Sequence, residues 1–372
     1  MARKKVVFVI RKSVNARKLW SGTVFSLYNE LIKIYEIENL YVKESVVEKV
    51  KRRLNYIFHT SFFKEDCQCK LIQQAQKSYV RRYKNERHIV FQFFEAPMTD
   101  NTMNFIYQDL CVEYLIDLNK NEPDIFEKRE FHAFSEKDML KRAIRQQSFY
   151  QNCEAVFTMG QWQADYIVEN CRIDREKVLA VGGGVNLDVT KYSPTKRNKK
   201  RFLFVGRNFE RKGGCIILEA FNRLRTNYVE DAQLYVVGGH SHKYNHMDGV
   251  YFIGDVSSSE IVDYYNLCDV FCMPSYFEAY GIAFIVALCF AMPCIGRNCN
   301  EMPYIIKEGQ NGYLINSDDV DELCSKMLLA LDNDTMHKYL EQKRTEYIKE
   351  YSWENVVNKM KRVIDEKAKI DV

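Results

Sequence analysis

The most informative segment of this chain is Phe204-Val-Gly-Arg-Asn-Phe-Glu-Arg-Lys-Gly-Gly214. Its apolar start predicts a buried strand, and Gly206 lets the backbone turn towards a helix without a Cβ clash. Arg207 and Lys212 follow the carboxyl end of the strand, where two cations and a helix N-terminus favour a bound phosphate. The alternative is a polar turn with exposed basic side chains. The loop lacks the Gly-x4-Gly-Lys-Ser/Thr pattern, so a Walker A site is excluded.

A second segment, Met273-Pro-Ser-Tyr-Phe-Glu-Ala-Tyr-Gly-Ile-Ala-Phe284, has the same order of strand, loop and helix. Glu278 lies at the strand end, where its carboxylate could accept hydrogen bonds from sugar hydroxyls. Gly281 and Ile282 begin the helix, and the free N–H groups of its first turn could face a phosphate. The alternative for Glu278 is that it only stabilises this first turn.

Short β-branched or aromatic runs alternate with longer amphipathic segments along the whole chain, which is typical of βαβ units and a parallel sheet. This rhythm predicts strands at Val6–Ile10, Leu40–Val42, His88–Phe93, Ala155–Met159, Val178–Val181, Arg201–Val205, Gln233–Val237, Val250–Ile253, Asp269–Met273 and Cys294–Ile295. It predicts helices at Val24–Ile34, Lys137–Tyr150, Gln161–Asn170, Gly214–Leu224, Ser259–Leu267, Ile282–Phe290, Asp319–Leu331 and Trp353–Ile364.

The length of 372 residues fits two domains of roughly 150 residues each. The polar stretch Asn186–Lys200 interrupts the rhythm, so we expect an N-terminal domain of residues 1–188, joined by the terminal helix 352–372, and a C-terminal domain of residues 189–351. No window has the roughly 18 apolar residues of a membrane-spanning helix. The 12 cysteines include no Cys-x-x-Cys pair, and we interpret Cys67 and Cys69 as unrelated thiols in a reducing cytoplasm.

Positive charge is concentrated near the N-terminus: residues 1–100 carry a net charge of +10 and the remainder carries −6. The basic residues cluster in Lys49–Arg53 and Lys77–Lys84, where apolar spacing predicts helices with one basic face. Such a face suits anionic lipid headgroups or a phosphate-bearing acceptor, and a solvated surface is the alternative. Nucleic acid is not expected as a partner, because no recognition motif accompanies the charge. We expect a cytoplasmic protein with peripheral membrane contact as an option.

The two loop segments resemble the donor-binding elements of retaining glycosyltransferases of family 4, which have the GT-B fold. Arg207 and Lys212, with Gly213 following, match the family's Arg-x4-Lys-Gly loop. Glu278 matches the first residue of its Glu-x7-Glu motif, but Val286 stands at the second position. In the family this second glutamate usually hydrogen-bonds the nucleotide ribose. Because Val286 cannot make this hydrogen bond, the resemblance implies one of three things: the ribose is held otherwise, the donor differs, or the activity is weak.

The likeness extends from about Cys153 to the end of the chain. It implies an α/β protein of two Rossmann-like domains facing each other across a cleft, with the C-terminal helix crossing back to the N-terminal domain. The degenerate Ser21-Gly-Thr23 occupies the place of a glycine-rich loop near the donor phosphate. The resemblance assigns donor binding to Gly22, Thr23, Gly206, Gly254, Asp255, Val256, Ala279, Tyr280, Gly281 and Ile282.

The expected reaction moves a sugar from a nucleoside-diphosphate donor, UDP- or GDP-linked, to a hydroxyl of a glycan, lipid-linked or other acceptor. Arg207 and Lys212 would stabilise the departing diphosphate and Glu278 would orient the sugar, so no metal or cofactor is expected. The alternatives are a nucleotide-sugar epimerase or a phosphorylase on the same fold, or a non-catalytic subunit that binds nucleotide sugar.

Three further residue patterns have two interpretations each. Asp319-Val-Asp321 has the Asp-x-Asp form of metal-dependent glycosyltransferases, but its position at a helix start favours N-capping. Asp109 and His132 are candidates for the acceptor side of the site, and hydrogen-bonded structural roles are the favoured alternative for both.

Overall fold

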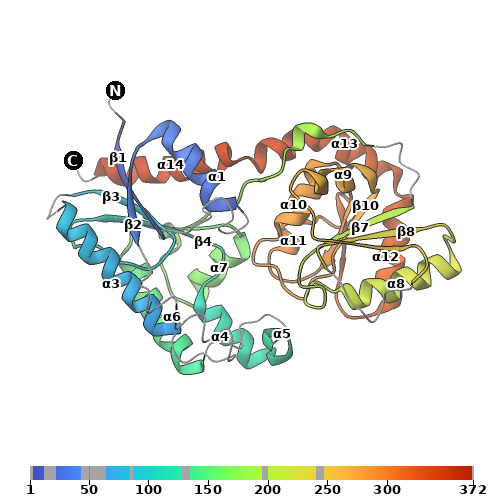
Figure 1. Cartoon of the computed structure of the whole chain (residues 1–372), viewed down its shortest axis with the longest axis horizontal. Coiled ribbons are helices and arrows are strands. Elements are labelled where there is room, and N and C mark those ends of the chain that lie inside the picture. The colour runs from blue at the N-terminus through green and yellow to red at the C-terminus, as the bar shows by residue number, and fades with distance from the viewer. Residues whose placement is uncertain are drawn as a thin grey trace. The chain divides into compact units, whose positions relative to one another are not determined.

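The computed structural model describes residues 3–11, 22–42, 50, 64–83, 87–127, 135–194, 200–239 and 247–370, without the side chains of residues 11, 64–71 and 370. The contacts within this part of the chain define two compact units (Figure 1). One unit comprises Met1–Asn186 with Trp353–Val372, and the other comprises Leu187–Ser352.

The N-terminal unit contains a six-stranded sheet in the order β2-β1-β3-β4-β5-β6. All neighbouring strands are parallel, and most of their buried side chains are apolar, as expected for a parallel sheet that helices cover. The strands are β1 (Lys5–Arg11), β2 (Glu36–Val42), β3 (Ile89–Gln92), β4 (Met103–Gln108), β5 (Ala155–Thr158) and β6 (Val178–Ala180).

The helices of this unit include α6, which begins where the Ser135 hydroxyl accepts a hydrogen bond from the Asp138 N–H. They are α1 (Thr23–Ile34), α3 (Lys64–Tyr83), α4 (Val112–Asn121), α5 (Pro123–Glu127), α6 (Glu136–Asn152), α7 (Gln161–Glu169) and α14 (Trp353–Ile370), with the 3-10 turn η3 (Arg175–Lys177).

The last helix, α14, packs against α1, as Figure 1 shows. The Trp353 indole N–H donates to Asn186 Oδ1 over 2.7 Å, and the Ser26 hydroxyl donates to the same oxygen over 2.7 Å. A Cβ at Gly184 would lie 2.5 Å from the Trp353 ring, so only glycine permits this close packing. The end of the chain therefore belongs to the N-terminal unit, as the family resemblance implies.

The C-terminal unit also contains a six-stranded parallel sheet, in the order β12-β11-β10-β7-β8-β9. Its strands are β7 (Arg201–Val205), β8 (Gln233–Val237), β9 (Val250–Gly254), β10 (Val270–Cys272), β11 (Cys294–Arg297) and β12 (Gly312–Ile315). Its helices are α8 (Gly214–Asn227), α9 (Glu260–Leu267), α10 (Ile282–Cys289), α11 (Met302–Ile305), α12 (Val320–Asp332) and α13 (Asp334–Glu350), with the 3-10 turn η4 (Val189–Lys191).

Aromatic side chains fill the core of the C-terminal unit. Phe202 on β7 meets Phe221 on α8 edge to face at 6.2 Å, and Phe271 on β10 meets Phe284 on α10 at 5.2 Å. All four side chains are fully buried. Burial of such large side chains stabilises the unit and fixes β7 and β10, the two neighbouring strands from which the candidate site extends.

The strands and helices predicted from the rhythm of the sequence are confirmed, with ends that differ by a few residues. Several elements were not predicted. Among them are the strands β4 and β12 and the helices α4 and α13. Polar residues interrupt the apolar pattern of β4, and β12 begins with a glycine. The α/β class with two parallel sheets is confirmed.

Candidate functional site

The candidate site lies in the C-terminal unit, in the loops that follow β7 and β10. The two strands are parallel neighbours, with Phe202 paired to Val270 and Leu203 to Phe271. Their carboxyl ends therefore meet at one edge of the sheet, which is where open α/β sheets bind ligands.

The loop after β7 is folded so that Lys212 passes back over the strand end. A Cβ at Gly206 would lie 2.1 Å from Lys212 Cδ, so the glycine makes room for the lysine side chain. The Asn208 side chain accepts the Arg211 N–H, and its carbonyl accepts the Lys212 N–H. Gly213 has φ +79°, and a Cβ there would lie 2.3 Å from the Pro274 carbonyl oxygen. The loop after β7 thus packs directly on the loop after β10.

Three side chains converge on the carboxylate of Glu278. The Lys212 ammonium donates to Glu278 Oε1 over 2.9 Å, and the Arg211 guanidinium lies 3.5 Å from the same oxygen. The Ser275 hydroxyl is also 2.9 Å from Oε1. The side chains of Glu278 and Lys212 are 12% and 14% exposed, so the pair is largely shielded yet still reached by solvent.

The electrostatic balance of the site keeps Glu278 ionised. Burial on its own would raise the pKa of the carboxyl, but the charges of Lys212 and Arg211 and the hydrogen bonds from Lys212 and Ser275 outweigh it, so the pKa is lowered from 4.5. The cluster therefore carries one negative and two positive charges. Its net charge of +1 suits an anionic ligand.

Arg207 lies apart from this cluster. Its guanidinium pairs with Asp255 over 3.3 Å, and the two side chains are 86% and 71% exposed. The sequence predicted Arg207 and Lys212 as the pair of cations, whereas the structure brings Arg211 and Lys212 to Glu278. Sequence reasoning missed Arg211 and Ser275, although both lie inside the two segments that it singled out.

The other predicted donor residues lie around the same sheet edge. Gly254 is the last residue of β9, and Asp255 and the half-buried Val256 follow it. Ala279 and Tyr280 lead from Glu278 to Gly281, which has φ +77° and caps α10, and Ile282 is the first residue of that helix. Val286, at the position of the second family glutamate, is buried within α10.

Gly22 and Thr23 belong to the N-terminal unit. Gly22 has φ +92° and precedes α1, and Thr23 is the buried first residue of that helix. The neighbouring Ser21 lies outside the described residues, as do His132 and most of the basic cluster at 49–53.

Asp109 follows β4 in the N-terminal unit and is half-buried. Burial raises the pKa of its carboxyl, and backbone hydrogen bonds and the charge of Arg142 offset this only in part. The residue before it, Gln108, belongs to a polar network that the sequence analysis did not predict. Glu95 is fully buried and accepts hydrogen bonds from Gln108 over 3.1 Å and Gln146 over 2.5 Å.

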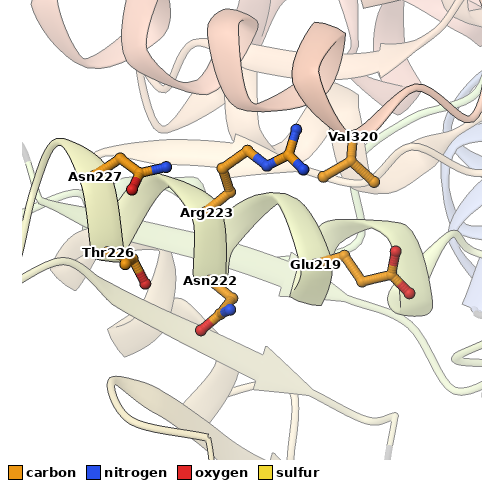
Figure 2. Close-up of a pocket in the computed structure, with 6 residues that line it drawn as sticks. All are labelled: Glu219, Asn222, Arg223, Thr226, Asn227 and Val320. Carbon is orange, nitrogen blue, oxygen red and sulfur yellow. The ribbon is translucent and has the colours of Figure 1, made fainter.

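The Asp-x-Asp pattern is a helix cap. The Asp319 carboxylate accepts the backbone N–H groups of Asp321 and Glu322 at the start of α12, so the capping interpretation is confirmed. Asp321 instead pairs with Arg223. Arg223 lines an open groove of about 410 Å³ between α8 and α12. Figure 2 draws its lining residues, which are Glu219, Asn222, Arg223, Thr226, Asn227 and Val320.

The described residues also lack two kinds of feature. They contain no cluster of three or more His, Cys, Asp or Glu side chains that could hold a metal ion. Their helices include none with an apolar stretch long enough to cross a bilayer. No disulfide joins two of the cysteines whose side chains are described, and Cys67 and Cys69 lie outside that set.

The C-terminal unit is similar in sequence to a known protein family. Residues 189–351 match the family described as Glycosyl transferases group 1. An uncharacterized glycosyltransferase of Methanocaldococcus jannaschii is 23% identical over 269 residues, which cover 71% of this chain and 74% of that protein. A phosphatidyl-myo-inositol mannosyltransferase of Mycobacterium leprae is 26% identical over 199 residues, which cover 50% of this chain and 53% of that protein.

The fold also matches solved structures. The sucrose-phosphate synthase from Thermosynechococcus elongatus aligns with a TM-score of 0.70 at 13% identity, covering 99% of this chain and 100% of that chain. At this identity the likeness shows the fold alone. It confirms the GT-B fold class that the family resemblance implies.

Proposed function

Residues 189–351 belong to the glycosyl transferases group 1 family, and on that premise we propose that the chain transfers a sugar from a nucleoside diphosphate to an acceptor hydroxyl. The transfer retains the anomeric configuration and needs no metal ion. The acceptor is a hydroxyl of a glycan or of a lipid-linked sugar.

The cationic cluster beside Glu278 is the single observation that carries this proposal. Departure of the nucleoside diphosphate gathers negative charge as the glycosidic bond breaks, and positive groups already in place stabilise that charge. Lys212 has three N–H donors. Glu278 Oε1 and Met273 Sδ, 3.4 Å away, accept two of them, and within the described part of the chain the third is free for a phosphate oxygen.

The remaining groups have supporting roles. Arg207 is exposed and attached to a glycine turn, so it can leave Asp255 and approach a bound diphosphate. The N-terminus of α10, which starts after Gly281, offers free N–H groups at the same sheet edge. Oε1 of Glu278 is held by Lys212 and Ser275, and among the described residues the second carboxylate oxygen is available to a sugar hydroxyl.

A screen against nucleotide sugars tests the proposal. The full chain is heated with UDP- and GDP-sugars, and a donor that binds the native state raises the melting temperature. Donors that bind are then incubated with and without a panel of glycan and lipid-linked acceptors, and nucleotide release and product mass are measured. Acceptor-dependent release with a product heavier by one sugar supports a transferase.

Other results of this screen would contradict the proposal. Conversion of the donor sugar without nucleotide release indicates an epimerase, and release that requires inorganic phosphate indicates a phosphorylase. Tight donor binding without turnover across the panel indicates a non-catalytic binding subunit. The anomeric signal of the product in a proton NMR spectrum tests retention. An unchanged rate in EDTA is expected, because Lys212 and Arg207 supply the positive charge.

The basic N-terminal region motivates a finer proposal, that the acceptor is presented at an anionic membrane surface. On α3, Lys77, Val80 and Arg81 are exposed along one face, and Val80 is 45% exposed. A basic face with an apolar residue suits an interface rich in anionic lipid. Flotation with vesicles containing phosphatidylglycerol should recover the chain at low salt, and equal recovery with neutral vesicles would contradict it.

A further inference from the structure

Three side chains next to the Lys212–Glu278 pair connect the loops at the carboxyl edge of the C-terminal sheet. Arg297 is the last residue of β11, Tyr276 follows β10, and Asp318 follows β12. The Arg297 guanidinium donates to Asp318 Oδ1 over 2.5 Å, and the Tyr276 hydroxyl donates to Asp318 Oδ2 over 3.0 Å. The Arg297 guanidinium also lies 4.5 Å from the centroid of the Tyr276 ring. We call these three residues the loop clamp.

The loop clamp is built around the arginine. The Arg297 side chain is 12% exposed, whereas Asp318 is 55% exposed. A second contact of Arg297 reaches the Pro274 carbonyl oxygen at 3.5 Å, at the start of the loop that carries Glu278. Stacking on an aromatic ring together with planar hydrogen bonding is a geometry that arginine provides and lysine does not.

The loop clamp continues into the candidate site through backbone and side-chain contacts. The Tyr276 N–H donates to the Arg211 carbonyl oxygen over 3.1 Å. The Arg211 guanidinium donates to the Phe277 carbonyl oxygen over 2.7 Å and reaches Glu278. The strands concerned are β12, β11, β10 and β7, which are consecutive neighbours in the sheet. An unbroken series of contacts therefore joins the loops of four adjacent strands and ends at the Lys212–Glu278 pair.

We propose that Arg297 and Tyr276 are positioning residues that hold the loop after β10 so that Glu278 stays beside Lys212. This inference rests on the proposed function of that pair. The Asp318 end of the loop clamp is exposed, and exposed ion pairs contribute little to stability. A small displacement of a reacting group, by contrast, costs much of the rate. The loop clamp serves the geometry of the site more than the stability of the fold.

The test combines kinetics with amide hydrogen exchange on the full chain. The variants are Arg297→Ala, Arg297→Lys and Tyr276→Phe. The matched control is Arg223→Ala, which removes another Arg–Asp pair of the same unit, in the groove between α8 and α12 (Figure 2). For Arg297→Ala we expect kcat to fall roughly 10–10²-fold, since the loop can shift by a fraction of an ångström to one ångström. Exchange in residues 274–281 should become faster.

The conservative variants and the control show which property of the loop clamp matters for kcat. Arg297→Lys keeps the charge but loses the planar fork, so we expect an intermediate loss of kcat with KM for the donor little changed. Tyr276→Phe keeps the ring under the guanidinium and loses one hydrogen bond, so its effect should be the smallest of the three. Arg223→Ala should change neither kcat nor exchange in residues 274–281.

Two results would overturn the inference. Unchanged exchange in residues 274–281 of Arg297→Ala would show that the loop is held by other contacts. Faster exchange with unchanged kcat would show that the loop clamp orders the loop without serving the reaction. A wild-type chain that transfers no sugar overturns the proposed function itself, and the positioning role falls with it. An active wild type with unaffected variants overturns the positioning role alone.

Discussion

Each unit of the molecule carries a shielded glutamate just after a buried parallel strand, and the two glutamates differ in what surrounds them. Glu278, after β10, faces Lys212 and Arg211 and keeps 12% of its side chain exposed. Glu95, after β3, is fully buried, accepts two glutamine amides and lies 3.6 Å from Arg142. Both carboxyl groups have a lowered pKa, although burial opposes it in each case.

The surroundings of the two glutamates indicate which carboxylate is available to a ligand. The donors around Glu95 come from Gln108 on β4 and Gln146 on α6, so this carboxylate connects elements of the N-terminal unit. The donors around Glu278 leave the cluster with excess positive charge at an edge that solvent reaches. We therefore assign stability to the Glu95 network and chemistry to the Glu278 cluster, and the predictions below test that division.

The largest expected effect is on turnover in Lys212→Ala. Removing one donor to a developing anion costs about 10²–10³ in kcat, and we expect a loss on this scale. Lys326→Ala is the matched control, because Lys326 pairs with Glu308 elsewhere in the same unit. Steady-state assays with saturating donor check both variants. Wild-type turnover in Lys212→Ala would contradict the role of the cluster.

Glu278→Gln should separate the two glutamates by activity. The amide keeps the size of the side chain but loses its charge, so the sugar and Lys212 are oriented less well and kcat should fall about 10²-fold. Glu95→Gln should leave kcat per folded molecule unchanged. Equal losses of kcat in the two variants would contradict the assignment of chemistry to Glu278 alone.

The loss of stability should be larger in Glu95→Gln than in Glu278→Gln, which is the reverse of the order expected for kcat. Glu95→Gln places an amide N–H₂ among the amides of Gln108 and Gln146, and a buried donor left without a partner costs about 1–3 kcal/mol of unfolding free energy. We expect a smaller loss for Glu278→Gln, because solvent reaches its cluster. Urea unfolding at pH 7 measures both. A larger loss in Glu278→Gln would show that the two roles are exchanged.

The unfolding free energies of wild type and of these two variants should also depend on pH. Because each folded-state pKa lies below 4.5, ionisation of Glu95 and Glu278 stabilises the fold at pH values above about 4.5. That contribution is lost as the pH falls through the folded-state pKa. The stability difference between wild type and each Gln variant should therefore shrink between pH 6 and pH 3. A difference that grows on acidification would contradict the ionised states.

Much of the fold could be predicted because buried parallel strands are short apolar runs. The strand β4 was missed because Asn104 and Gln108 interrupt its pattern, and both are buried only because partners such as Gln92 and Tyr150 satisfy them. Such partners are distant in sequence and cannot be read from local spacing. The helix α13 was missed because it is largely polar, with few buried side chains.

The candidate site was predicted in its location but not in its pairings. Spacing identified the two loops, yet it could not show that Arg211 turns towards Glu278 while Arg207 turns towards Asp255. That choice depends on the positive φ of Gly213 and on the side-chain bond of Asn208. The loop clamp could not be predicted from the sequence either, because Tyr276, Arg297 and Asp318 are up to 42 residues apart.

The smallest expected effect concerns the nucleotide ribose. Val286 is apolar and buried, so it offers no acceptor for a ribose hydroxyl. Loss of a hydrogen bond to a charged group is worth about 1.5–3 kcal/mol, or roughly 10–10²-fold in affinity. We therefore expect UDP and 2′-deoxy-UDP to bind with equal affinity in calorimetric titrations. Tenfold weaker binding of the deoxy nucleotide would show that another side chain replaces the missing glutamate.

The most direct test of the central claim is a crystal structure of the chain with a bound nucleotide sugar or nucleoside diphosphate. The account predicts diphosphate oxygens within hydrogen-bond distance of Lys212 Nζ, with Arg207 turned from Asp255 towards the same group. A diphosphate bound elsewhere in the molecule, with Lys212 still held only by Glu278 and Met273, would contradict it.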